Sequence, residues 1–442
     1  MDSIASDTWV QARVEFAMEE WWRAGGAWQR TGPVYSARQQ GLREKAYDRA
    51  LEDVRRACRK RTADAEQRLT RAFARFAAEA LDLGPDAIEL LTHGFLPVGK
   101  QLARWARRFD ASLSHGDITQ AARNAWTACG MQPLFGARLR LTGSILGYSL
   151  LYPYSDNYLD QRAVTHDDKV RFSRRFRARL RGDALHAAGP HERSIWELVR
   201  LIEMEFPRRA FPAVFDALLA IHAAQEESVR QLEQCGGLEE RELLRISCAK
   251  GGTSVLADAC LVRGRLTRQE GEFGFLWGVL LQLGDDLQDV VEDLERGSDT
   301  LFTRAVRSGM RLDGLVARLL NFSECVGARM EALPHGDATH NDLLRMSWRS
   351  LILMAVGQAQ AYFSAGFLAR MEPCSPFRFE FLRARREKLE GERGLFERIF
   401  ELVLNSEEEG GIELPPAPEL VSRPFDAEGK ALRCDAVVAS DG

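Results

Sequence analysis

The sequence predicts an all-α protein, and three features favour this fold class. Apolar side chains recur near a 3.6-residue period over most of the 442 residues, as they do in amphipathic helices. Alternating strand-type runs and Asn-Gly hairpin turns are almost absent. Hydrophobic residues make up 45% of the chain and charged residues 28%, an ordinary balance for a globular protein with a sizeable core. We therefore expect helices packed on helices.

The helical periods divide the chain into three expected parts. Residues 1–85 are highly charged and end at a Gly84-Pro85 stop, which predicts a helical N-terminal extension. Residues 86–404 form the main α-helical domain. Residues 405–442 are Glu-rich and then Pro-rich, the composition of a flexible tail. In the main domain we expect helices at 97–108, 118–129, 135–160, 194–205, 211–235, 239–262 (broken at Gly251-Gly252), 268–296, 311–332, 341–371 and 377–404, with a polar, Arg-rich segment at 165–181.

Composition excludes several classes of function. A formal net charge of -4, with acidic and basic residues interspersed, argues against a nucleic-acid partner. The eight cysteines are scattered without a Cys-x-x-Cys pair, so neither a zinc site nor a disulfide framework is indicated. The N-terminus lacks the features of a signal peptide, and the apolar segment 351–368 contains Gln358 and Gln360, which favours a core helix over a membrane span. We expect a cytoplasmic protein without a transmembrane segment.

A ladder of carboxylates is the most informative feature of the sequence. Within the expected helix 268–296, residues four apart share one face, which carries Trp277, Leu281, Asp285, Asp289 and Asp293. Carboxylates stacked in this way repel one another unless a cation lies among them. Magnesium is the natural resident, since it takes oxygen ligands from one or two carboxylates together with substrate phosphates. A solvated acidic face is the alternative, although no Lys or Arg occurs between the first and last of these aspartates.

A second acidic pair lies upstream, at Asp156 and Asp160, and stepping back by four residues gives Tyr152 and Tyr148. Pro153 predicts a kink or restart of this helix. Taken alone, a surface pair is the favoured interpretation. Taken with the first ladder, the two helices describe a deep apolar cavity in a helical bundle, rimmed by carboxylates that hold magnesium against a polyphosphate. An apolar substrate with a diphosphate head would fit, and an aromatic wall would stabilise an allylic cation.

These motifs resemble those of the class I isoprenoid (terpenoid) synthase superfamily. The segment Leu281-Gln-Leu-Gly-Asp-Asp-Leu-Gln-Asp289 is similar to the second aspartate-rich motif of trans-polyprenyl diphosphate synthases, and Asp156-Asn-Tyr-Leu-Asp160 is similar to the first, with Asn157 replacing an aspartate. Ser247-Cys-Ala-Lys-Gly-Gly-Thr-Ser254 is similar to the Lys-Thr-Gly stretch of that family, where the helix is broken and the lysine contacts diphosphate. The match covers about residues 144–302.

The resemblance implies a class I terpenoid synthase-type bundle, a prenyl diphosphate substrate and three Mg²⁺ ions. It assigns metal binding to Asp156, Asp160, Asp285, Asp286, Asp289 and Asp293, of which Asp156, Asp160, Asp285 and Asp289 are also expected to be catalytic. It assigns diphosphate binding to Lys250 and Arg162, and the cavity wall to Tyr148, Tyr152, Trp277, Leu281 and Gln282. The sequence leaves open whether the protein forms a homodimer.

Departures from the family pattern favour a one-substrate enzyme. Chain-elongating synthases follow the first motif with Arg-Arg-Gly, whereas this chain has only Arg162 there. We therefore expect a terpene synthase, with chain elongation and a catalytically silent partner or lipid-binding subunit as alternatives. Arg171, Arg174 and Arg175 share a helix face that could contact phosphate, although a solvated basic face is the favoured interpretation. A surface interaction is likewise favoured for His222 and Glu226.

Overall fold

The structure, a computed structural model, describes residues 4–30, 32–59, 64–161, 163–233, 237–390, 398–399 and 402. Every regular element within these residues is a helix, so the all-α prediction is confirmed. No helix in this described part has the length and apolar character needed to cross a bilayer. The predicted tail, residues 405–442, lies outside it.

Nineteen α-helices and three short helices of other types are assigned in these ranges. They are α1 (Asp7–Ala24), α2 (Ala37–Arg59), α3 (Ala65–Glu79), α4 (Pro85–Glu89), η1 (Leu90–Phe95), α5 (Leu96–Phe109), α6 (His115–Leu134), α7 (Gly143–Asp160), α8 (His166–Arg181), α9 (Pro190–Glu205), α10 (Pro212–Ser228), α11 (Arg230–Glu233), α12 (Glu240–Arg263), α13 (Arg268–Gln288), α14 (Val290–Arg296), α15 (Leu301–Arg307), α16 (Asp313–Glu331), α17 (Ala338–Gln358), η2 (Gln360–Tyr362), α18 (Ala365–Met371), η3 (Glu372–Cys374) and α19 (Phe379–Glu390).

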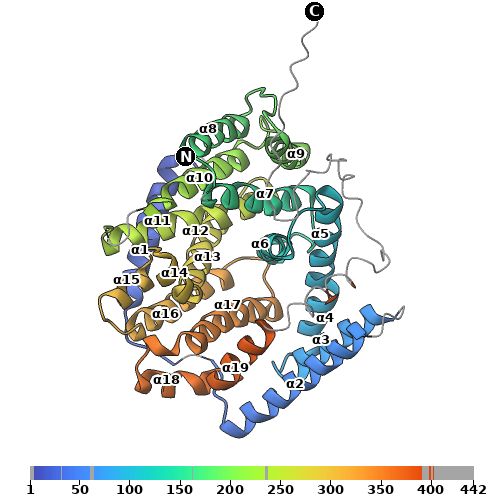
Figure 1. The fold of residues 1–442 in the computed structure, drawn as a ribbon, viewed down its shortest axis with the longest axis vertical. Coiled ribbons are helices and arrows are strands. Elements are labelled where there is room, and N and C mark those ends of the chain that lie inside the picture. Colours follow the sequence, from blue (N-terminus) through green and yellow to red (C-terminus); the bar gives the residue numbers. More distant parts are fainter. Residues whose placement is uncertain are drawn as a thin grey trace, which may run out of the picture.

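The helix pair α12 and α13 lies at the centre of the bundle. Helix α12 also contacts α1, α6 and α10, and α13 also contacts α16 and α17 (Figure 1). Glycines allow the two central helices to approach closely, because a Cβ on Gly278 would lie 2.0 Å from the carbonyl oxygen of Gly251. The predicted helix break at Gly251-Gly252 is therefore wrong. Helix α12 is continuous, and its glycines provide room for α13 instead.

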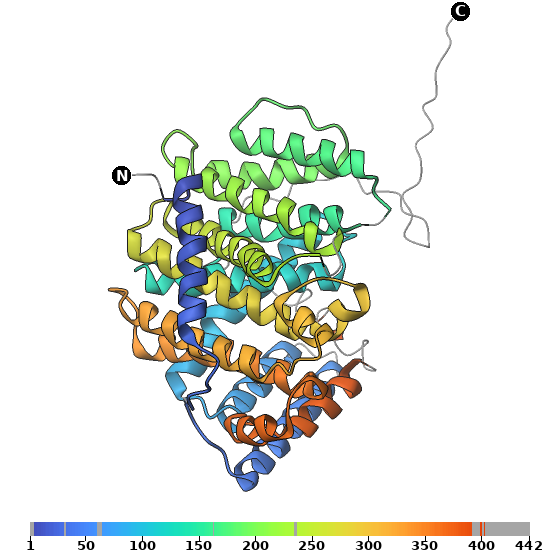
Figure 2. The same ribbon diagram turned by 90° about the vertical axis from the view of Figure 1, so that its left-hand side faces the viewer.

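The N-terminal helices pack in two different places. Helix α1 runs along one side of the bundle (Figure 2) and buries Met18 and Trp21 in the main core. Helices α2 and α3 pair with each other. Tyr47 of α2 makes edge-to-face ring contacts with Phe76 and Phe377, which gives this region a small apolar cluster of its own. The expected domain boundary near residue 85 stays a prediction.

The Arg-rich segment 165–181, expected only to be polar, folds as helix α8. The Thr165 side chain accepts a hydrogen bond from the backbone N–H of Asp168 at its start, and Gly182 adopts a left-handed conformation at its end. Phe172 and Phe176 are buried one turn apart on its inner face. The predicted helix 135–160 begins only at Gly143, because a turn separates it from α6.

Candidate functional site

The face that carries the carboxylate ladder passes from the protein interior to solvent. Trp277 is buried, Leu281 is partly buried, the Asp285 side chain is 42% exposed and Asp289 is exposed. Helix α13 ends at Gln288, yet the backbone N–H of Asp289 still donates to the carbonyl oxygen of Asp285 at 2.9 Å. The N–H of Asp293 donates to the carbonyl oxygen of Asp289 at 2.8 Å, so the four-residue spacing continues into α14.

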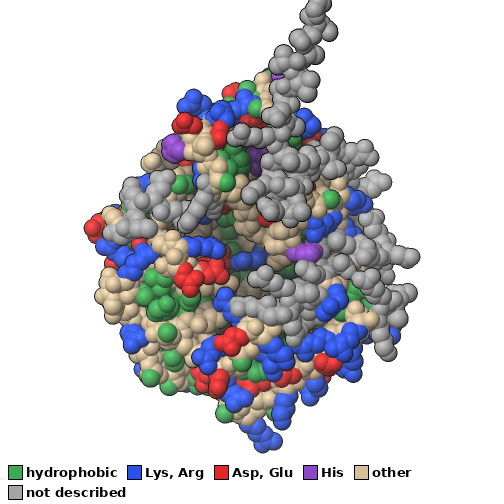
Figure 3. Space-filling model, viewed as in Figure 1, with side chains coloured by type: hydrophobic (Ala, Val, Ile, Leu, Met, Phe, Trp, Pro, Cys, Tyr) green, Lys and Arg blue, Asp and Glu red, His purple; other side chains and the backbone are tan. Residues whose placement is uncertain are grey.

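These carboxylates destabilise one another's charged form. Burial, followed by the charges of Asp285 and Asp293, raises the pKa of Asp289 to about 6. Burial also raises the pKa of Asp285, although that side chain keeps 42% of its surface exposed. The raised pKa and the exposed surface of Asp285 are both explained by a position in a recess, where protein atoms surround the carboxylate but solvent still reaches it. In Figure 3, acidic side chains gather near the centre of the face, over the place of α13 and α14 in Figure 1, beside a hollow bordered by Lys and Arg.

Asp286, the next carboxylate, is directed into the contact with α12. Its side chain accepts hydrogen bonds from Ser247 Oγ at 2.9 Å and Gln282 Nε2 at 2.8 Å, and only 7% of the residue is exposed. Burial raises its pKa to about 7. A carboxyl group that still holds a proton near neutral pH, and whose oxygens already accept two hydrogen bonds, is a poorer metal ligand than the exposed Asp289.

Two cations from neighbouring helices face the carboxylates. Burial raises the pKa values of Asp285, Asp286 and Asp293, and the charge of Lys250 on α12 offsets part of that rise. Lys250 forms no ion pair with any residue that the structure describes. Arg123 of α6 donates from Nη2 to Asp285 Oδ1 at 2.9 Å. Sequence reasoning missed Arg123, because it is a single arginine in a helix far from either motif.

The first acidic motif lies next to the second. The charge of Asp156, burial and a hydrogen bond to Asp156 raise the pKa of Tyr152 well above its ordinary value, and Asp285 contributes in the same direction. Tyr152 on α7 is therefore close to carboxylates of both motifs. Asn157 points elsewhere, since its Nδ2 donates to Asp117 Oδ1 at 2.9 Å.

Two predicted site residues cannot be placed, and of the kink or restart expected at Pro153 the restart is not seen. The side chain of Asp160 and the whole of Arg162 lie outside the described residues. Helix α7 continues through Pro153 without a restart.

Behind Tyr152, the site closes against a buried polar cluster. Tyr148 is buried, and its hydroxyl donates to the carbonyl oxygen of Ser254 at 3.1 Å. Asp258, one turn further along α12, is fully buried and accepts from Asn124 Nδ2 at 3.1 Å. Burial raises the pKa of Asp258 well above its ordinary value, which favours the protonated carboxyl.

The predicted deep apolar cavity is not confirmed. Tyr152, Leu281 and Gln282 are partly exposed, whereas Tyr148 and Trp277 are buried. Two cavities, of about 670 and 500 Å³, are lined by other residues. The larger lies between α16, α17 and the chain around Leu83, and the smaller lies beside α8.

The donor set fits a hard divalent cation that is shared with a ligand. Carboxylate oxygens, mutual repulsion and partial exposure are what magnesium requires. Among the described residues, no three His, Cys, Asp or Glu side chains are arranged to hold a metal ion by themselves. The residues therefore fit magnesium only as one or two carboxylates per ion, completed by phosphate oxygens and water.

Comparison with models of protein families, with curated proteins and with solved structures yields no match to this chain. A functional assignment therefore rests on the geometry and chemistry of the recess.

Proposed function

We propose that the protein is a magnesium-dependent class I terpene synthase, which ionises and cyclises one prenyl diphosphate and releases diphosphate. The observation that carries this proposal is the setting of Tyr152, which hydrogen-bonds Asp156 and whose pKa is also raised by the charge of Asp285. It supports the two acidic motifs as opposite rims of one recess. Magnesium, when bound there, would supply Lewis-acid stabilisation of the leaving diphosphate.

The residues of the recess would divide the work between them. Asp285, Asp289 and Asp293 on one rim, and Asp156 with Asp160 on the other, would hold the ions. Lys250 and Arg123 would bind the diphosphate and stabilise the charge that develops as the carbon–oxygen bond breaks. The partly exposed ring of Tyr152 would face the allylic cation, which an aromatic face attracts. Arg162 would add a diphosphate contact in this scheme.

One observation favours the silent alternative as a second candidate. Asp285 already has a cationic partner in Arg123, at 2.9 Å. An ion pair of this kind could fill the place of the metal in a helical protein that binds a partner or a lipid without catalysis. Under the enzymatic proposal, Arg123 must instead exchange Asp285 for the diphosphate when substrate and magnesium enter.

The test is product analysis with a panel of prenyl diphosphates and magnesium, with and without isopentenyl diphosphate. Hydrocarbon or alcohol from the allylic substrate alone, lost in Asp285→Asn and Asp156→Asn, supports the proposal. Glu295→Gln is the matched control, because it removes one exposed carboxylate from α14 outside the ladder. Longer diphosphates formed only with both substrates would establish elongation instead. Absence of magnesium-dependent diphosphate release from every substrate would leave the silent alternative.

A further inference from the structure

A second concave site lies beside α8, at the C-terminal end of α7. This cavity, of about 500 Å³, is bounded by α8, by the end of α10 and by the last turn of α7. Its volume is in the range typical of small-molecule sites. We call it the α8 pocket. Helices α8 and α10 lie side by side at the top of Figure 1.

One face of α8 supplies most of the charged lining. His166, Lys169, Arg174 and Arg177 lie at helical spacing along that face and border the α8 pocket, and Arg230 borders it from α11. Glu226 is the one acidic side chain in the lining. A cleft lined mainly by one sign of charge concentrates its electric field and attracts ions of the opposite sign.

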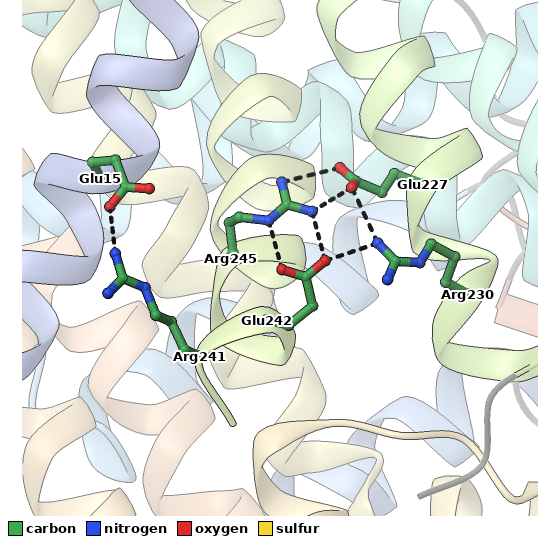
Figure 4. A network of polar contacts seen from close by, with 6 residues as sticks. All are labelled: Glu15, Glu227, Arg230, Arg241, Glu242 and Arg245. Carbon is green, nitrogen blue, oxygen red and sulfur yellow. Dashed lines mark hydrogen bonds and ion pairs between the residues drawn. The ribbon is translucent and has the colours of Figure 1, made fainter. Parts of the chain in front are cut away.

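Two of these cations are already neutralised. Arg177 forms an ion pair with Glu226. Arg230 donates to Glu242 at 2.8 Å and to Glu227 at 3.5 Å, as part of the network with Arg245 drawn in Figure 4. Hydrogen bonds from Arg245 lower the pKa of Glu242 to about 2, so this carboxylate is charged at neutral pH.

Lys169 and Arg174 differ from their neighbours on the same helix. Arg171, Arg175 and Arg179 pair with Asp168, Glu192 and Glu203 respectively. In contrast, neither Lys169 nor Arg174 has an ion pair or hydrogen bond with any residue of the described ranges. The cations of α8 without partners among the described residues thus include two that border a cavity, partly exposed Lys169 and exposed Arg174.

Apart from Ser173, the remaining wall of the α8 pocket is apolar. Leu159, Val164, Val170 and Val229 line it, of which Leu159 is buried and Val170 is 43% exposed. His222, expected at the surface, is instead buried behind this wall, with Nε2 3.0 Å from the hydroxyl of Ser173. Unpartnered cations next to exposed aliphatic side chains form a surface complementary to an anion that carries an alkyl chain.

From this geometry we infer that the α8 pocket binds a phosphorylated amphiphile, with its phosphate on Lys169 and Arg174 and its chain on the valines. Arginine offers two parallel hydrogen bonds to phosphate, and lysine adds a compact charge. The source of such a phosphate is either a free alkyl phosphate or the headgroup of an anionic lipid. The inference does not depend on the proposed function, since it uses no residue of the recess.

The test measures binding of octyl phosphate and inorganic diphosphate by calorimetry, and of vesicles containing phosphatidic acid by co-sedimentation, all in EDTA. Lys169→Ala/Arg174→Ala is compared with Arg171→Ala/Arg181→Ala, which removes the same charge from α8 outside the pocket lining. We expect octyl phosphate to bind more tightly than diphosphate. The pocket variant should weaken it about tenfold or more, the loss typical of a charge-assisted contact.

The controls should stay close to the wild type. Arg171→Ala/Arg181→Ala should change the dissociation constant less than about twofold, well below the tenfold step of 1.4 kcal/mol. Lys250→Ala, which removes one of the two cations of the recess, should also retain binding, so this inference and the proposed function can fail separately. Equal weakening in both double variants, or no saturable binding of any probe by the folded wild type, would overturn the inference. Vesicle binding lost only in the pocket variant would identify a lipid headgroup as the source.

Discussion

Replacing Asp286 by asparagine should stabilise the protein, and increasingly so as pH rises. In the folded chain burial raises the pKa of Asp286 to about 7, from an ordinary value of 3.8. Between those values the folded state binds more protons than the unfolded state, so this group's contribution to stability falls as pH increases. The fall is about 1.4 kcal/mol per pH unit, or about 4 kcal/mol from pH 4 to pH 7 as an upper figure. Above pH 7 it levels off.

Asparagine removes this dependence while keeping the local hydrogen bonds. Gln282 Nε2 can still donate to the amide oxygen, and the new amide can donate to Ser247 Oγ in place of the bond from that hydroxyl. The assay is guanidinium denaturation of both proteins at pH values from about 4.5 to 8. Equal m-values would show that both proteins expose the same surface on unfolding, so their free energies of unfolding can be compared. Contributions of other acids cancel in the difference between the two proteins. We expect near-equal stability at the acidic end and a gain of about 2–4 kcal/mol at the basic end. Parallel profiles, or a less stable variant at pH 8, would refute the account of Asp286 as a buried carboxyl that holds its proton.

Three further predictions concern the central helices and the recess. Gly278→Ala should destabilise the fold by about 3 kcal/mol or more, because the added Cβ would meet a backbone carbonyl. Gly41→Ala, whose Cβ would meet nothing within 4 Å, should be neutral or stabilising by about 0.5–1 kcal/mol. Chemical denaturation measures both free energies of unfolding. Magnesium should raise the melting temperature more at pH 8 than at pH 5, since Asp289 loses its proton near pH 6, and Asp289→Asn should reduce that difference; an equal shift at both pH values would contradict it. Arg123→Gln should slow diphosphate release about tenfold or more while retaining the fold by circular dichroism, and unchanged turnover would exclude Arg123 from the diphosphate site.

The sequence predicts the features that depend on helical periodicity. The all-α class and the shared face of Asp285 and Asp289 follow from a spacing of four residues, which survives even the interruption of the helix after Gln288. Features that depend on partners distant in sequence could not be predicted. Arg123 lies 162 positions from its carboxylate, and no local pattern marks such a pair.

Gly251 and the Arg-rich segment 165–181 also show that local sequence alone does not determine local structure. Gly251 is compatible locally with a helix break or with a close helix contact, and only the neighbouring helix decides between them. The abundance of arginine in segment 165–181 predicts only a polar stretch, although Phe172, Phe176 and Leu180 give it a clear inner face at helical spacing. The depth of a cavity depends on how side chains fill the bundle, which periodicity does not report.

The close crossing of α12 and α13 sets the width of the recess. A Cβ at Gly251 of α12 would lie 2.4 Å from the Cβ of Gln282 of α13. Lys250 is the residue before Gly251 on α12, and Asp285 lies three residues after Gln282 on α13. The absence of a side chain at Gly251 thus lets the helix that carries Lys250 lie close to the helix that carries Asp285. A single added carbon there would wedge the two helices apart, and so the sharpest constraint on the chemistry of the recess falls on residues that take no part in it.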